Sequence, residues 1–274
     1  MAYVRTRLGR WFSEERGAAR TGDPAIVLLH GLLFDSGMWR AQVEPLSELG
    51  RVVMFDGPGH GKSTELPPPF SLEDQADALM DAFAELSIDR AVLVGLSWGG
   101  MLAMRAAIKH PARVAAMALL DTSADREEPA NAVKYRLFIS FTRRFGLPLW
   151  FVRRELAGLM FGPRTLRERP ELVDQFTRRV NGFSRDGMAR AARAVVVNRK
   201  SIVEKLGQVT AKTLVICGRD DRSTPPAKSE QMAAGIAGAK LVWIEDAGHM
   251  SAIERPEAVN AALLPFVREH VSPR

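Results

Sequence analysis

The sequence predicts an α/β protein built on a mostly parallel sheet, with helices on both faces and one helical insertion. Short apolar runs rich in β-branched residues alternate with longer stretches of helical periodicity through most of the 274 residues. The runs lack polar alternation, which is typical of parallel strands covered on both faces. The alternation stops between Asp121 and Thr213, where only helical stretches punctuated by Gly and Pro appear, and this indicates an insertion.

Eight strands are expected, and the first two form an antiparallel hairpin at the sheet edge. Val4–Leu8 and Trp11–Glu15 alternate between apolar and polar residues and are joined by Gly9. The six further strands are Ala25–Leu29, Arg51–Phe55, Ala91–Leu96, Val114–Leu120, Thr213–Cys217 and Leu241–Ile244. The helices between them are expected near Trp39–Leu49, Leu72–Leu86, Gly99–Lys109, Ala227–Ala237 and Pro256–His270.

The net positive charge of the chain comes from the insertion. The formal net charge is +6, but residues 124–205 hold 18 Lys or Arg against 9 Asp or Glu, so the remainder of the chain is net negative. Basic pairs that recur among apolar residues at helical spacing indicate solvated faces of amphipathic helices. No nucleic-acid recognition motif accompanies this charge, so we expect no nucleic-acid partner.

Cysteine usage and hydropathy suggest a cytoplasmic protein. The one cysteine, Cys217, cannot form an internal disulfide, and the N-terminal residues lack the apolar stretch of a secretory signal. No apolar run approaches the ~18 residues of a membrane span. We therefore expect a cytoplasmic location and no membrane partner, while the oligomeric state stays open.

A serine nucleophile is predicted where a strand turns into a helix. The segment GLSWGG (95–100) follows the strand residues Ala91–Val94 and opens the next helix, which is the context in which G-x-S-x-G has catalytic meaning. Small neighbours are needed because the serine sits on a strained turn. Ser97 is therefore the candidate nucleophile.

A base and an orienting acid are expected at the same sheet edge. His249 follows the last strand, where ligand sites of α/β sheets gather, so it is the candidate general base. The acid that orients it should lie between serine and histidine in the chain. Asp220 and Asp221 both follow the strand Thr213–Cys217, and Asp121 follows the strand Val114–Leu120, so the residues alone leave these three candidates open.

These motifs resemble the α/β-hydrolase superfamily, in order from Ala25 to Val267. Its landmarks are matched by HG (30–31), GPGHGKS (57–63), the GLSWGG turn and GH (248–249). The family pattern G-x-x-D-x-x-x-P falls on Gly218, Asp221 and Pro225, so the resemblance selects Asp221 as the acid. Residues 124–205 correspond to the family's helical cap, and residues 1–123 and 206–274 to its core domain. The GLSWGGM segment, the C-terminal segment and the cap are most similar to enzymes like 3-oxoadipate enol-lactonase.

The resemblance implies a serine esterase or lactonase that works through an acyl-enzyme. The oxyanion of the intermediate needs backbone N–H donors, which the family pattern places at Leu32 and Trp98. Metal-ligand spacing is absent from the sequence, and this mechanism needs no metal and no cofactor. Alternatives are a perhydrolase or haloperoxidase-type activity on the same triad, a C–C bond hydrolase, and a non-catalytic ligand receptor.

An apolar substrate pocket is expected between the cap and the core. The aromatic residues of the cap favour a small-molecule ester or lactone over a charged phosphoester. His30, next to the oxyanion loop, is expected to shape that loop. The candidate lining residues are His30, Leu33, Phe138, Phe141, Trp150, Met160 and Met250.

Overall fold

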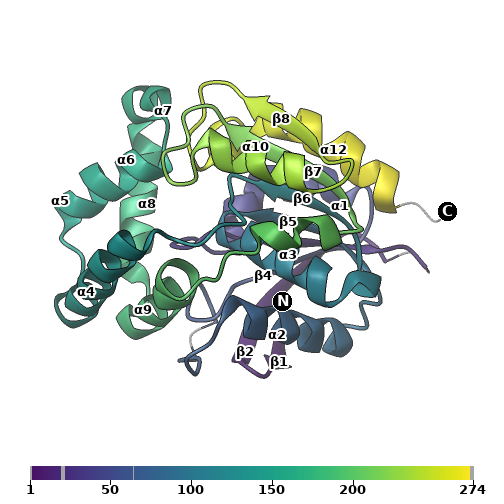
Figure 1. The fold of residues 1–274 in the computed structure, drawn as a ribbon, viewed down its shortest axis with the longest axis horizontal. Helices are drawn as coiled ribbons and strands as arrows, with labels where there is room; N and C mark the ends of the chain where they lie inside the picture. The colour runs from purple at the N-terminus through teal and green to yellow at the C-terminus, as the bar shows by residue number, and fades with distance from the viewer. Residues whose placement is uncertain (1, 20–21, 64, 272–274) are drawn as a thin grey trace.

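The computed structural model describes residues 2–19, 22–63 and 65–271, and an eight-stranded sheet forms its centre (Figure 1). The strand order is β1-β2-β4-β3-β5-β6-β7-β8. β1 and β2 form the expected hairpin, β2 runs antiparallel to β4, and the remaining pairs are parallel. The strands are β1 Ala2–Thr6, β2 Gly9–Arg16, β3 Ala25–Leu29, β4 Val52–Phe55, β5 Ala91–Leu96, β6 Val114–Leu120, β7 Lys212–Gly218 and β8 Lys240–Ile244.

Two layers of helices cover the sheet because its central strands are apolar on both faces. In β3, Val27 and Leu29 join one buried cluster while Ile26 and Leu28 join the other. The first face is covered by α2 (Leu72–Glu85), α3 (Trp98–Lys109) and α10 (Pro226–Gly235). The second is covered by α1 (Arg40–Ser47) and α12 (Pro256–Val271), with the short α11 (Ser251–Glu254) beside them. The predicted α/β-hydrolase architecture is thus confirmed.

The segment between β6 and β7 is helical and forms a lobe beside the sheet (Figure 1). Its α-helices are α4 Pro129–Phe145, α5 Leu149–Phe151, α6 Ala157–Met160, α7 Pro163–Glu168, α8 Pro170–Gly182 and α9 Arg185–Ala192. Two π-helical turns, η3 Val152–Leu156 and η4 Arg193–Val197, continue α5 and α9, and 3₁₀ turns lie at η1 Ser36–Trp39, η2 Pro111–Arg113 and η5 Val203–Gln208. We keep the name cap for residues 124–205, whose boundaries stay a prediction.

The cap contacts the core at two places where glycine permits close approach. A Cβ atom at Gly162 would lie 2.9 Å from the backbone nitrogen of Gly248, and one at Gly187 would lie 2.9 Å from the Cα atom of Gly59. The backbone N–H of Met250 also donates to the carbonyl of Met160, at 3.1 Å. These contacts hold the cap over the carboxyl edge of the sheet.

Among the described residues, no helix is long and apolar enough to cross a membrane.

Candidate active site

Ser97 occupies a strained turn between β5 and α3. Its φ of +53° and ψ of −112° lie in a region that residues with a side chain rarely adopt. A Cβ atom at Gly95 would lie 2.4 Å from the carbonyl carbon of Gly99, and one at Gly99 would lie 2.0 Å from the carbonyl oxygen of Leu29. Only glycine fits at these two positions, which lets the serine hydroxyl stand at the end of the strand.

Three of the predicted residues meet at the carboxyl edge of the sheet. Nε2 of His249 lies 2.9 Å from Oγ of Ser97, and Nδ1 of His249 lies 2.9 and 3.1 Å from the two carboxylate oxygens of Asp221. All three residues are buried, although they come from the ends of β5, β7 and β8. These contacts have the geometry that a Ser-His-Asp triad requires.

The structure separates the three acid candidates that the residues alone left open. Asp221 accepts hydrogen bonds from the backbone N–H groups of Ser223 and Thr224 and from the Thr224 hydroxyl, which hold its carboxylate against the imidazole. Asp220 is exposed to solvent. Asp121 is buried, but it accepts from the backbone N–H of Gly218 and from Ser251 instead of the histidine.

The surroundings of His249 make it a stronger base than a histidine in water. Burial by itself lowers the pKa of the imidazole, but the charge and hydrogen bond of Asp221, together with the charges of Asp121 and Glu254, outweigh burial and raise the pKa above its ordinary value. The geometry and the pKa together suit an imidazole that accepts a proton from Ser97 Oγ.

A buried carboxylate that the sequence reasoning missed supports the loop of His249. Oε1 of Glu254 accepts from the N–H groups of Gly248 and Met250, on either side of the histidine, at 2.9 and 3.3 Å. Oε2 accepts from the N–H of Gly162 in the cap at 2.8 Å. Glu254 therefore joins the histidine loop to the cap. Its position in an apolar stretch soon after His249 was the available sequence signal.

Two neutral histidines shape the loop that follows β3. The N–H of Gly57 donates to Nε2 of His30 at 2.6 Å, and the other ring nitrogen of His30 lies 2.7 Å from the carbonyl of Gly31. The N–H of Leu33 donates to Nε2 of His60 at 3.3 Å. Burial lowers the pKa of both imidazoles, that of His60 to about 3, so both stay neutral at ordinary pH. His30 and His60 thus both make hydrogen bonds within this loop, while His30 as a residue of the substrate pocket stays a prediction.

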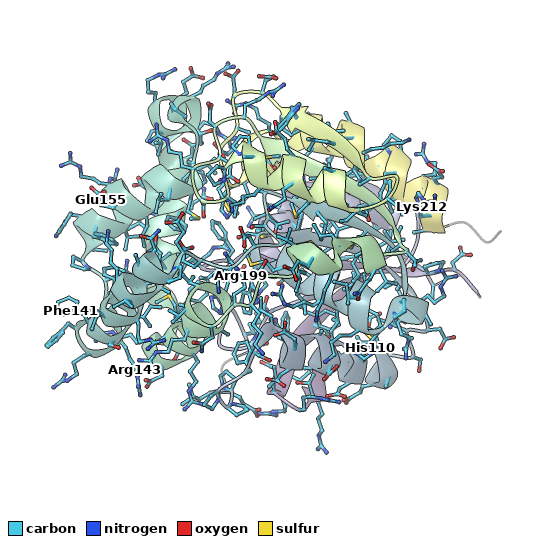
Figure 2. The ribbon with its side chains drawn as sticks, in the orientation of Figure 1. His110, Phe141, Arg143, Glu155, Arg199 and Lys212 are labelled. Atoms are coloured by element: carbon cyan, nitrogen blue, oxygen red, sulfur yellow. The ribbon has the colours of Figure 1, made fainter. Side chains whose placement is uncertain are left out.

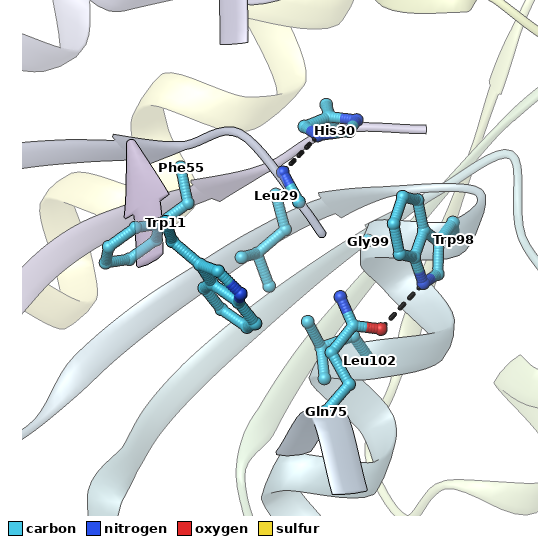
Figure 3. Close-up of a pocket in the computed structure, with 9 residues that line it drawn as sticks. Trp11, Leu29, His30, Phe55, Gln75, Trp98, Gly99 and Leu102 are labelled. Carbon is cyan, nitrogen blue, oxygen red and sulfur yellow. Dashed lines mark hydrogen bonds between the residues drawn. The ribbon is translucent and has the colours of Figure 1, made fainter. Parts of the chain in front are cut away.

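The Trp98 side chain is directed toward Gln75 (Figure 3). Its indole N–H donates to the Gln75 side chain at 2.7 Å, and its ring is buried against His30 and His60. The cavity beside it has a volume of about 10 Å³, which is room for about one water and not for a substrate. A larger hollow of about 230 Å³, lined by Asp23, Arg51 and neighbouring residues, lies at the opposite edge of the sheet, away from the triad.

The structure places the predicted pocket residues in two groups. Met160 and Met250 are buried beside the His249 loop, and Leu33 and Phe138 are half-buried. Phe141 and Trp150 are 55% and 64% exposed, and Figure 2 shows Phe141 pointing outward from the cap. We therefore withdraw these two from the pocket: α4 and α5 turn them to solvent, which aromatic composition alone does not reveal.

One group of buried side chains has the spacing of metal ligands but lacks free donor atoms. Ligand atoms of Asp121, Cys217 and Asp221 lie within 4.8 Å of one another. Oxygens of both carboxylates already accept N–H or O–H groups, and burial raises the pKa of the Cys217 thiol to about 12, which keeps it protonated. These residues do not fit a metal ion.

Known proteins with similar sequences or structures share this architecture. The family model described as alpha/beta hydrolase fold matches residues 24–256. A thermophilic esterase from Thermogutta terrifontis superposes with a TM-score of 0.91 at 29% identity, over 99% of this chain and 100% of that one. The enol-lactonase from Burkholderia xenovorans gives a TM-score of 0.87 at 26% identity, over 97% and 99%. A 2-hydroxy-6-oxononadienedioate/2-hydroxy-6-oxononatrienedioate hydrolase from Klebsiella pneumoniae is 28% identical over 90% of this chain and 88% of its own length.

Proposed function

We propose that this chain, which belongs to the alpha/beta hydrolase fold family, cleaves carboxylic esters or lactones through an acyl-enzyme on Ser97. The observation that carries the proposal is the unbroken chain of hydrogen bonds from Ser97 through His249 to Asp221. Similarity to an esterase and an enol-lactonase supports the choice of a carboxylic ester bond as the target.

In the first half of the proposed reaction, Ser97 Oγ attacks the carbonyl carbon of the substrate while His249 Nε2 takes the hydroxyl proton. Asp221 stabilises the imidazolium that forms. The tetrahedral intermediate collapses, its bond to the alkoxy oxygen breaks, and His249 gives the proton to the departing alkoxide. For a lactone the alcohol stays attached to the acyl group, so the ring opens on the serine.

In the second half, a water molecule replaces the alcohol beside His249. The histidine takes a proton from the water, the resulting hydroxide attacks the acyl carbon, and Ser97 leaves with that proton. The products are the free acid and the regenerated serine.

The oxyanion formed in both halves requires two backbone donors, which we assign to the N–H groups of Trp98 and Leu32. Trp98 is the first residue of α3, directly after the nucleophile. On the other side, the Leu33 N–H already donates to His60, which favours Leu32 as the second donor. One such donor typically contributes about 3 kcal/mol to transition-state stabilisation.

The substrate selectivity that we propose follows from the apolar side chains near the triad. Met160 and Met250 lie beside the histidine loop, and Leu33 follows the oxyanion loop. These side chains favour an uncharged acyl or alcohol group of small or medium size.

The test is a panel of initial rates on p-nitrophenyl esters and on γ- and δ-lactones, with enol lactones and acyl-homoserine lactones included. We expect turnover by the parent and a loss of at least about 1000-fold in Ser97→Ala. Ser223→Ala is the matched control, because that hydroxyl is exposed and should be dispensable. Folded parent protein that turns over no member of the panel, or equal rates in Ser97→Ala, would overturn the proposal.

A further inference from the structure

The outer face of α4 carries an apolar stripe that faces solvent. Val133, Leu137, Phe141 and Phe145 follow one another at four-residue spacing, which places them on one side of the helix. Each is more than half exposed, whereas Ile139 on the opposite side is buried. An amphipathic helix ordinarily turns such a stripe toward a core. In α4 a different side of the helix faces the core, so these four apolar side chains are left exposed to solvent.

The same surface continues into α5. Leu149 and Trp150 are also more than half exposed, and the rings of Phe138 on α4 and Phe151 on α5 lie 5.1 Å apart. Of the nine large apolar side chains that are exposed among the described residues, seven lie between residues 133 and 159. Figure 1 shows α4 and α5 on the outer rim of the cap, and Figure 2 shows Phe141 there. We call the following residues the cap stripe: Val133, Leu137, Phe141, Phe145, Leu149 and Trp150.

Basic residues surround the cap stripe, and the nearest acidic residues in sequence, Glu128 and Glu155, flank it. Residues 133–154 contain six Lys or Arg and no Asp or Glu. Two of the six, Arg143 and Arg153, form ion pairs with other parts of the cap. Within the part of the chain that the structure describes, the other four have no acidic partner: Lys134, Arg136, Arg144 and Arg154.

The charge decides which partner fits this surface. A second copy of the chain would bring two strongly basic stripes together, and the repulsion would oppose the contact. An anionic lipid surface offers acyl chains for the apolar residues and negative headgroups for the basic ones. A tryptophan at the edge of such a face is typical of side chains that sit at a membrane interface.

We propose that the cap stripe docks the protein on the surface of a membrane that contains anionic lipids. The contact is peripheral: α4 lies in the plane of the headgroups with its apolar face down, and Lys134, Arg136 and Arg144 reach the phosphates. This revises our expectation from the sequence that the chain has no membrane partner. It does not depend on the proposed hydrolase activity.

The direct test measures binding to vesicles of phosphatidylcholine alone and of phosphatidylcholine mixed with phosphatidylglycerol. Flotation measures the bound fraction, and Trp150 reports contact, because Trp11, Trp39 and Trp98 are almost fully buried and the half-buried Trp243 lies on β8, outside the cap. We expect binding to the mixed vesicles, with a blue shift of emission and quenching by brominated lipid. Trp150→Phe should keep binding and lose most of the optical signal.

Two variants separate the apolar and the charged parts of the contact. Leu137→Ser with Phe145→Ser should weaken binding by at least about 10-fold. Exchange of Lys134, Arg136 and Arg144 for Gln should weaken binding to mixed vesicles by roughly 100-fold, at about fivefold for each charge. Tyr3→Ser, which removes an exposed aromatic side chain on the hairpin, is the control and should bind like the parent.

Three results would overturn the proposal: no binding to either vesicle, equal binding to both, or full binding by the Leu137→Ser/Phe145→Ser variant. Sedimentation, which measures the oligomeric state of the protein, completes the test. A concentration-dependent dimer that the same double variant abolishes, without vesicle binding, would assign the surface to a second copy instead. Binding by Ser97→Ala equal to that of the parent would show that docking and catalysis are independent.

Discussion

The backbone of α3 lies close to that of β3 at Gly99, and this close approach predicts the outcome of a single added methyl group. An alanine Cβ there would lie 2.0 Å from the carbonyl oxygen of Leu29 and 2.5 Å from its carbonyl carbon. Contacts under 3.0 Å are essentially never seen, so β3 and α3 must separate by at least about 1 Å. Both neighbours are backbone, so no side-chain rotation relieves the clash.

Two effects set the expected size of the loss in Gly99→Ala. Overpacking against backbone costs about 3 kcal/mol of folding free energy, and the better helix propensity of alanine returns about 1 kcal/mol. The net loss of about 2 kcal/mol corresponds to a decrease in melting temperature of roughly 5 °C for a chain of this length. Displacement of Ser97 and the Trp98 N–H by about 1 Å costs roughly 100-fold in kcat.

The assay is kcat on p-nitrophenyl acetate beside a thermal melt, with Gly158→Ala as the matched control. Gly158 also lies in a helix, α6, but an added Cβ would meet nothing within 4 Å. The control should keep its activity and melt at or slightly above the parent temperature. If Gly99→Ala behaves like Gly158→Ala in both measurements, the close approach is not what positions the nucleophile, and the reasoning fails.

Three further predictions concern protons. Because His249 must be neutral to accept the Ser97 proton and its pKa is raised, kcat/KM should fall as pH drops through a value above 6.5; a midpoint below 6.5 in a pH–rate profile would contradict this. Asp221→Asn removes the charge that raises this pKa, so the midpoint should move down and kcat should fall by about 10⁴-fold, and an unmoved midpoint would count against Asp221 as its cause. The pKa of His60 is about 3 in the native state and ordinary in the unfolded state, so below pH 6.5 the unfolded chain binds a proton that the native chain does not. The free energy of unfolding therefore decreases as the pH is lowered below 6.5. His60→Gln should reduce this slope by about 1.4 kcal/mol per pH unit in urea unfolding between pH 6 and 4.5; an unchanged slope would assign it to other groups.

The strands and core helices could be predicted closely because each has a local cause. β3, β5 and β6 begin and end at the predicted residues, and the ends of the other predicted strands and helices differ by at most two residues. The apolar runs that a parallel sheet buries on both faces are continuous in sequence, and so are the turns that end them. The short helix α11 (Ser251–Glu254) was not predicted, because four residues carry no periodicity.

The candidate triad was partly accessible to the same reasoning. The G-x-S-x-G turn is local, since the glycines and the serine share one strained bend. The choice among Asp121, Asp220 and Asp221 was not local. It depends on which loop turns a carboxylate toward His249: the residues alone favoured Asp221 but left all three open, and the resemblance strengthened the choice of Asp221 before the geometry was known.

The supporting residues required the tertiary structure. Glu254 contacts Gly162 of the cap across 92 positions of sequence, and His60 meets Leu33 across 27. Neither pairing leaves a periodic signal, because hydrogen bonds between loops depend on backbone direction and not on composition. The same holds for Phe141 and Trp150, whose apolar character indicated a pocket although their helices face solvent.

The sequence by itself therefore determined the order of strands and helices, the position of the insertion and the nucleophile turn, since these follow from periodicity and from the steric needs of neighbouring residues. Only the tertiary structure decided which acid meets the histidine, which carboxylate links the histidine loop to the cap, and which face of the cap is left apolar and basic. The physical reason is that these depend on how distant segments are oriented when they pack, and orientation is set by the whole fold.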